Sequence, residues 1–105
     1  MIKIKLKYNK GLIDSINVSG HAYYDDYGKD IVCASVSSIV ITTVNAIIRL
    51  ESNSIDYNDK DGIFISVLNH NKVTDALIDN MVSLLFELEE QYKKNIMINK
   101  EVCSC

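Results

Sequence analysis

The uncharged stretch from Ile31 to Ile48 constrains the fold more than any other part of the sequence. A stretch of this length without a charge could cross a bilayer as one helix. It contains six hydroxyl or amide side chains, however, and these are costly in hydrocarbon: Ser35, Ser37, Ser38, Thr42, Thr43 and Asn45. We therefore expect a buried helix of a soluble domain, and no membrane partner.

This helix is expected to begin near Asp30, a residue type preferred at helix N-caps, and to run to about Leu50. It is apolar or small on nearly every side, so it must be covered on more than one side. A chain of 105 residues is expected to form a single domain, 1–105, with one small core. The helix therefore predicts a subunit interface.

Alternation predicts a hairpin at the start of the chain. Apolar and polar residues alternate strictly over residues 2–8, and Asn9-Lys10-Gly11 supplies a turn. Residues 12–19 alternate more loosely, with three apolar residues expected on one side: Leu12, Ile16 and Val18. Residues 20–29 show no period and are expected to form a loop.

A second hairpin is expected from strands near 54–59 and 62–68, joined by Asp61-Gly62. Asn71 is expected to cap a second helix. Its apolar stripe is expected to comprise Val73, Leu77, Met81, Leu84, Leu85 and Leu88. Residues 95–102 are predicted to form a closing strand. The predicted class is α+β, with ββαββαβ order and a mostly antiparallel sheet packed by two long helices.

Charge and cysteine content limit the kinds of partner and the cell compartment that we expect. The net charge is −3, and the basic cluster of Lys3, Lys5, Lys7 and Lys10 alternates with apolar residues. That pattern favours a strand with one solvated face over direct nucleic-acid binding. Three cysteines without framework spacing, and a start that lacks signal-peptide features, predict free thiols in the cytoplasm.

Cys33 is the candidate nucleophile. It lies three residues after the expected cap, in the first turn of the helix. Backbone N–H groups there have no partner within the helix, and the helix dipole favours negative charge, so the reactive thiolate is favoured. The N–H groups of Val32, Cys33 and Ala34 are also expected to hold the oxyanion of a tetrahedral intermediate.

His21 is the candidate proton-transfer partner, because the intervening loop is long enough to return its imidazole to the helix start. A Cys/His pair is the working core of a thiol protease, and a third group usually orients the histidine. Asp30 and Ser37 share one helix face with Cys33, so Asp30 is a candidate to orient His21, and Ser37 to line the pocket. The spacing alone favours a buried cysteine, a loop histidine, a capping aspartate and a serine that bonds its own helix backbone.

The segment GHAYYDDYGKDIVCASVS, from Gly20 to Ser37, resembles the signature of the ribosomal-processing cysteine protease Prp family. That signature has Gly-His-Ala, a short loop, Gly-x-Asp, an aliphatic pair, Cys-Ala and, after two further residues, Ser. The matching positions are Gly20, His21, Ala22, Gly28, Asp30, Ile31, Val32, Cys33, Ala34 and Ser37. Val44-Asn45-Ala46-Ile47 is similar to the family's continuation of this helix.

The resemblance implies a cysteine endopeptidase that removes a short N-terminal extension from a large-subunit ribosomal protein, with no metal or organic cofactor. It implies that Cys33 is the nucleophile, and that His21 takes the thiol proton and then protonates the leaving amine. Asp30 and Ser37 match supporting positions. The resemblance also implies a homodimer. Ser35 departs from the pattern, because the family tends to have Gly or Ala there.

The loop between Gly20 and Gly28 is expected to act on the substrate. As a mobile lid, it would close on a peptide with its aromatic and acidic side chains: Tyr23, Tyr24, Asp25, Asp26 and Tyr27. The carboxylates would attract a basic segment near the start of a ribosomal protein. A solvated loop whose tyrosines pack locally is the alternative.

Two other functions stay open. One is a non-catalytic, ribosome-associated peptide-binding module, and the other is a redox sensor in which Cys103 or Cys105 resolves Cys33. Neither needs His21 at its motif spacing. A zinc site with His70 is not predicted, because four ligands at a recognisable spacing are missing. His70 is expected to be a turn residue.

Overall fold

A five-stranded sheet carries the fold. The computed structural model describes residues 1–20 and 27–103, with side chains in the second range from residue 31 onward. The elements are β1 (Ile2–Asn9), β2 (Leu12–Ser19), α1 (Tyr27–Leu50), β3 (Ile55–Asn58), β4 (Ile63–Val67), α2 (Lys72–Gln91) and β5 (Ile96–Val102). The strand order is β3-β4-β2-β1-β5, and β5 joins β1 in parallel while the other pairs are antiparallel. The predicted class and element order are confirmed.

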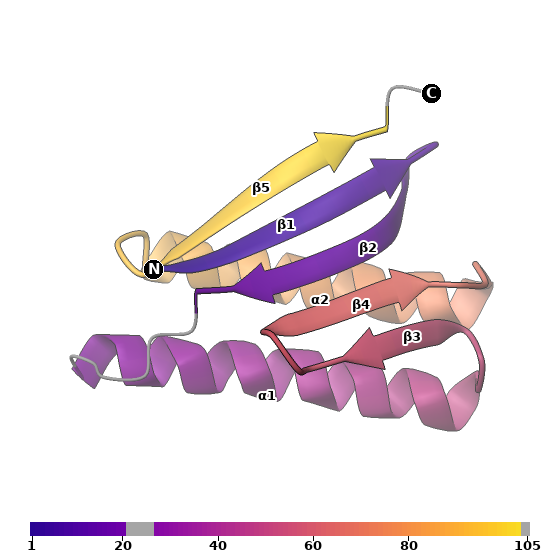
Figure 1. Cartoon of the computed structure of the whole chain (residues 1–105), viewed down its shortest axis with the longest axis horizontal. Helices are drawn as coiled ribbons and strands as arrows, with labels where there is room; N and C mark the ends of the chain where they lie inside the picture. Colours follow the sequence, from indigo (N-terminus) through magenta and orange to yellow (C-terminus); the bar gives the residue numbers. More distant parts are fainter. Residues whose placement is uncertain (21–26, 104–105) are drawn as a thin grey trace.

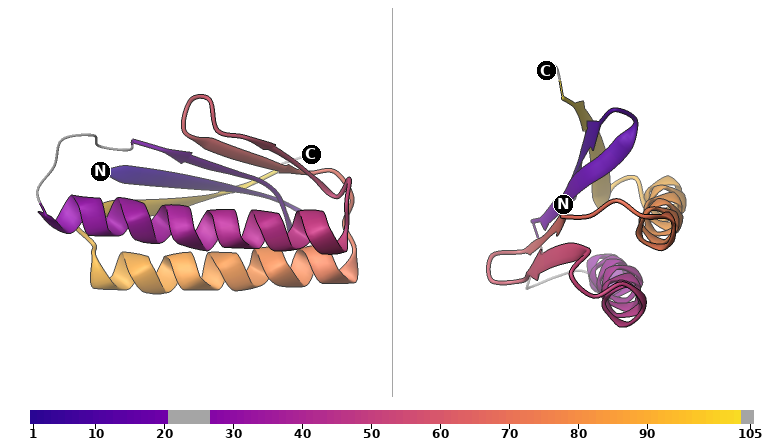
Figure 2. Two further views of the ribbon diagram at one scale, coloured as in Figure 1. Left: turned by 90° about the horizontal axis from the view of Figure 1, so that it is seen from below. Right: turned by 90° about the vertical axis from the view of Figure 1, so that its right-hand side faces the viewer.

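Both helices lie on one face of the sheet, side by side and running in opposite directions (Figures 1 and 2). The core lies between the two layers. Its fully buried side chains come from four strands and both helices: Ile4, Leu6, Ile16, Val18, Val32, Val36, Val40, Ile47, Ile65, Met81, Leu85 and Ile96. No described helix covers the opposite face of the sheet (Figure 2).

The first hairpin has the predicted turn, but one predicted core position is wrong. Lys10 and Gly11 form a two-residue turn with φ of 54° and 80°, as a type I′ turn requires. A bulge between Lys7 and Tyr8 then shifts the register. Since side chains alternate strictly, this shift buries Ile13 and leaves Leu12 42% exposed.

Helix α1 begins at Tyr27, three residues before the predicted start at Asp30, and ends at Leu50 as predicted. Tyr27 and Gly28 are therefore helical and not part of the loop. Each added turn brings further backbone hydrogen bonds once a helix is nucleated, and this outweighs the preference of an aspartate for the N-cap. Cys33 consequently lies in the second turn of α1.

Helix α2 has the predicted cap but a rotated core face. The side chain of Asn71 accepts a hydrogen bond from the Thr74 N–H at 2.9 Å, and its amide donates to the Ser54 hydroxyl at 3.0 Å. Val73 and Leu84, predicted to be buried, are 36% and 40% exposed. The buried face comprises Thr74, Ile78, Met81, Val82 and Leu85. Two apolar stripes compete on this helix, and packing against α1 and the sheet selects one.

Helix α1 packs into the core on one side and exposes further apolar side chains on the other. Among the described residues, Ile31–Leu50 is long and apolar enough to span a membrane, with a mean hydropathy of 2.1. One side packs into the core through a row at helical spacing: Val32, Val36, Val40, Val44 and Ile47. The exposed side carries a second row, called here the α1 stripe: Ile31, Ala34, Ser38, Ile41, Asn45 and Ile48.

Candidate active site

One end of the molecule, called here the loop end, brings together four chain segments. There β2 stops at Ser19, α1 begins at Tyr27, and α2 gives way to β5 (Figure 1). The first residues of the chain lie at the same end, because the N–H of Ile2 donates to the carbonyl of Asn95 at 2.9 Å. The start of α1 therefore lies close to the backbone that leads into the Gly-His-Ala motif.

Cys33 lies about 9 Å along α1 from its first residue, given a rise of about 1.5 Å per residue. Its side chain is half-buried and packs against the core. In the sequence it lies between Val32 and Val36, both of which are fully buried. The thiol makes no hydrogen bond with any described residue. Cys33 is thus held by a helix, and its side chain is partly buried but remains partly exposed to solvent.

Gly20 fixes where the motif leaves the sheet. Its φ is +78°, a conformation that L side chains rarely adopt, and a Cβ at this position would collide with the carbonyl oxygen of Met1. Glycine is therefore required on both counts. The predicted site residues that follow lie outside the described residues: His21, Tyr23, Tyr24, Asp25 and Asp26.

Ser37 lies one helical turn after Cys33 and is half-buried. The Ser35 and Thr43 hydroxyls donate to the carbonyls of Ile31 and Ile39, each at 2.8 Å, as helical Ser and Thr often do. The Ser37 hydroxyl makes no such bond in the described part of the chain. Of the hydroxyls near Cys33, that of Ser37 is available to another partner.

The expected oxyanion site is wrong as stated. In a helix that begins at Tyr27, the N–H groups of Val32, Cys33 and Ala34 lie beyond the first turn and bond to carbonyls four residues earlier. The N–H groups without helical partners are those of the first turn, from Tyr27 onward. The backbone of Asp30 also lies in that turn, so Asp30 is not the N-cap.

The described thiols do not form a redox pair or a metal site. Cys103 follows the end of β5, far from the loop end, whereas Cys33 lies near the start of α1 (Figure 1). A disulfide needs Cα atoms within about 7 Å. No group of three His, Cys, Asp or Glu side chains among residues 1–20 and 31–103 could hold a metal ion.

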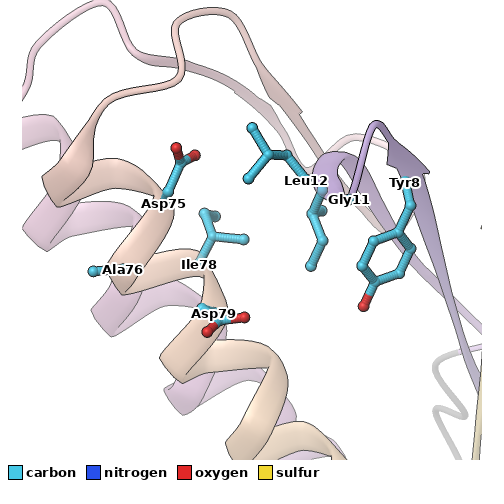
Figure 3. A pocket seen from close by; sticks show the side chains of 8 residues that line it. Tyr8, Gly11, Leu12, Asp75, Ala76, Ile78 and Asp79 are labelled. Atoms are coloured by element: carbon cyan, nitrogen blue, oxygen red, sulfur yellow. The ribbon is translucent and has the colours of Figure 1, made fainter.

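A hollow of about 330 Å³ lies away from the loop end, between the first hairpin and the first half of α2 (Figure 3). It is lined by Tyr8, Gly11, Leu12, Ile13, Asp75, Ala76, Ile78 and Asp79. Burial and then the Asp79 carboxylate raise the pKa of the Tyr8 hydroxyl above its usual value. A second hollow, of about 320 Å³, lies at the loop end and is lined by residues 90–95.

His70 is more than the expected turn residue. Its Nδ1 lies 2.7 Å from Asp75 Oδ1, and its Nε2 lies 3.1 Å from Asp14 Oδ1. The hydrogen bonds with Asp75 and then Asp14 raise the pKa of His70 above its usual value. The ring therefore clamps β2 to the start of α2, a role that depends on tertiary contacts and has no local sequence signal.

A half-buried thiol near the start of a core helix, on a small α+β domain, fits the class of cysteine hydrolases. Residues 1–97 match the family model for cysteine protease Prp. The chain belongs to this family and is a cysteine protease. The ribosomal processing cysteine protease Prp of Staphylococcus aureus is 36% identical over 104 residues, covering 94% of this chain and 98% of the relative. The Bacillus subtilis protein of that name is 29% identical over 107 residues, covering 94% and 95%.

Two solved structures of a Prp protease are also similar to this chain in fold and sequence. The S. aureus protease in complex with a substrate peptide has a TM-score of 0.88 and 33% identity, over 96% of this chain and all of that chain. The same protease with a covalently linked product peptide has a TM-score of 0.85 and 34% identity, with the same coverage.

Proposed function

We propose that this protein is an endopeptidase that removes the N-terminal extension of a large-subunit ribosomal protein, with Cys33 as nucleophile and His21 as acid and base. The position of Cys33 carries the proposal. It is half-buried near the start of α1, at the end of the molecule where Gly20 leads into His21. The names of the relatives, which describe ribosomal processing, support the choice of substrate.

The proposed chemistry has two steps. The Cys33 sulfur attacks the scissile carbonyl carbon while His21 accepts the thiol proton, and His21 then gives this proton to the leaving amine. Water next attacks the thioester, which releases the carboxylic acid product and restores the thiol. A relative with a covalently linked product peptide supports a covalent route.

We further propose two supporting residues, Ser37 and Asp30. The Ser37 hydroxyl, unbonded in the described chain and one turn from Cys33, is available to bind the substrate or orient the catalytic pair. Asp30 lies one turn before Cys33, where its carboxylate would orient His21. The proposed substrate loop supplies Asp25 and Asp26, whose charges suit a basic peptide.

The proposed working form is a cytoplasmic homodimer joined through the α1 stripe. Exposed isoleucines recur on this stripe, and the small residues Ala34 and Ser38 between them allow two helices to approach closely. Ile31, Ile41 and Ile48 are 37%, 44% and 49% exposed. A row of exposed isoleucines of this kind is typical of a protein interface.

The test is incubation with the full-length ribosomal precursor, followed by intact mass spectrometry. We expect one cut near the precursor's N-terminus, with a loss of at least about a hundredfold in rate for Cys33→Ala and for His21→Ala. Cys103→Ala, a matched change at an exposed position after β5, should keep the wild-type rate.

An intact precursor with correctly folded enzyme would instead favour the peptide-binding module. That alternative also predicts ordinary, slow alkylation of Cys33 at neutral pH. The redox alternative predicts a reversible disulfide between Cys33 and a tail cysteine, and the separation of Cys33 and Cys103 along the molecule argues against it.

A further inference from the structure

The helix-free face of the sheet carries its own pattern, independent of the protease site. We propose that this face binds single-stranded RNA. Strand pairing places residues from all five strands side by side on it, and no described helix covers it (Figure 2). The residues of this surface, called here the open face, include Lys3, Lys5, Lys7, Ser15, Asn17, Ser19, Asp56, Asn58, Phe64, Ser66, Met97, Asn99 and Glu101. Its three lysines thus share the face with two carboxylates, those of Asp56 and Glu101.

The open face carries a row of three lysines on β1, which suits a phosphate backbone. Lys3, Lys5 and Lys7 are exposed alternate residues of β1, so they stand on one face at intervals of about 6.7 Å. The Glu101 carboxylate, on the strand position that pairs with Lys7, lies 3.9 Å from the Lys5 ammonium, and both side chains are more than half exposed. Exposed pairs of this kind are weak, so phosphate groups can displace the carboxylate.

An aromatic ring and an amide beside the lysine row can contact the bases. Across the sheet, Lys5 is opposite Asn17, and Asn17 is opposite Phe64. Since neighbouring strands lie about 4.8 Å apart, the ring stands about 10 Å from the lysine row. Phe64 is 43% exposed on β4, the second strand from one edge of the sheet. A base can stack on an exposed ring, an amide can bond to its edge, and the lysines can bind the backbone.

The sequence pattern of the β1 lysines favoured a solvated strand face over direct nucleic-acid binding. The alternation in β1 shows only that they are solvated; it cannot show that Phe64, from a strand much later in the chain, lies on the same face. A second copy is a poor occupant, because two lysine rows would then face each other. An acidic protein segment would match the charges but would leave the exposed ring without a use.

The test is fluorescence anisotropy of a labelled 12-nucleotide single-stranded RNA with the whole protein at 50 and 200 mM salt. Three neutralised phosphates predict a slope of log K against log salt near −2, and so roughly a 20-fold loss over this range. Lys3→Gln/Lys5→Gln/Lys7→Gln should remove most of the binding and flatten the slope. Phe64→Thr should weaken binding about tenfold without changing the slope.

The control variant is Lys72→Gln/Lys93→Gln/Lys94→Gln, which removes the same charge from exposed positions on and beside α2. It should bind RNA like the wild type. Each of three outcomes would overturn the proposal: no salt-dependent binding at 50 mM salt, equal loss in the control variant, or equal binding of poly-glutamate. Peptide cleavage is measured separately and should be unchanged in the open-face variants, so failure here leaves the protease assignment intact.

Discussion

At the scale of single residues, the sequence explains the motif cysteine, Cys33, better than it explains the motif glycine, Gly20. Spacing and resemblance predict Cys33 as the nucleophile, and its place near the start of a rigid helix is compatible with that. Neither predicts why Gly20 is glycine. The reason is tertiary: its left-handed backbone passes so close to the Met1 carbonyl that any Cβ collides.

Gly20→Ala is therefore expected to destabilise the protein and to displace the backbone that enters His21. The left-handed conformation alone costs about 1–2 kcal/mol for a residue with a Cβ, and the collision adds to this. We expect a lower melting temperature and a fall in kcat that persists at temperatures where the variant is fully folded. Thermal unfolding and peptide cleavage measure the two effects.

Gly11→Ala is the matched control. Gly11 has a similar φ of +80°, but a Cβ there would have open space around it. This variant should lose stability by about 1 kcal/mol and keep its kcat. Equal loss of activity in the two variants would show that the close approach to Met1 has no special role.

At the scale of elements, short-range chemistry predicted the first hairpin turn and the cap of α2, but not the start of α1, and long-range packing decided much of the rest. The Lys10-Gly11 turn and the Asn71 cap were predicted correctly because each depends on a few adjacent residues. The buried face of α2 and the position of Leu12 were not, because another helix or a bulge decides them. The parallel pairing of β5 with β1 likewise has no local signal.

The His70 clamp is a contact between elements with a definite pH dependence. Because hydrogen bonds with Asp75 and Asp14 raise the folded-state pKa above the usual 6.5, the clamp stabilises the fold fully below about pH 6.5. Its contribution is lost as the pH rises through the folded-state pKa. His70→Gln should therefore cost up to about 1 kcal/mol at pH 6 and progressively less toward pH 9.

Urea unfolding from pH 5.5 to 9 measures this difference. Asp14→Asn should reproduce part of it, whereas Asp56→Asn, an exposed carboxylate on β3, should not. A cost that stays constant with pH would mean that His70 stabilises the protein by packing and not by its charge.

At the scale of the whole molecule, the sheet is covered by helices on one side only, and its core helix is exposed on its outer side. The sequence predicted the excess of apolar surface on α1, because a small core cannot bury every side of a helix that is apolar all round. The structure divides that surface into a buried row and the α1 stripe. Two different surfaces, the stripe and the open face, are therefore left uncovered by the described part of the chain.

The proposed dimer predicts that Ile41→Asp yields a monomer. A carboxylate at the middle of the α1 stripe would be buried without a partner in the dimer, at a cost of several kcal/mol. Sedimentation velocity at micromolar concentration should show the shift in mass. Leu50→Asp, which is 64% exposed on the last turn of α1 but off the stripe, is the matched control and should remain dimeric. A dimeric Ile41→Asp would exclude this interface.

The parallel pairing of β5 with β1 sets the order in which a newly made chain can complete its fold. Ile2 pairs with Ile96, so the edge of β1 has no partner until translation has passed the last helix. Until then, a nascent chain displays an open strand edge, which is prone to aggregate. Pairings so distant along the chain also form slowly. A protease that depends on its complete sheet would thus be inactive until β5 has been synthesised and has paired with β1.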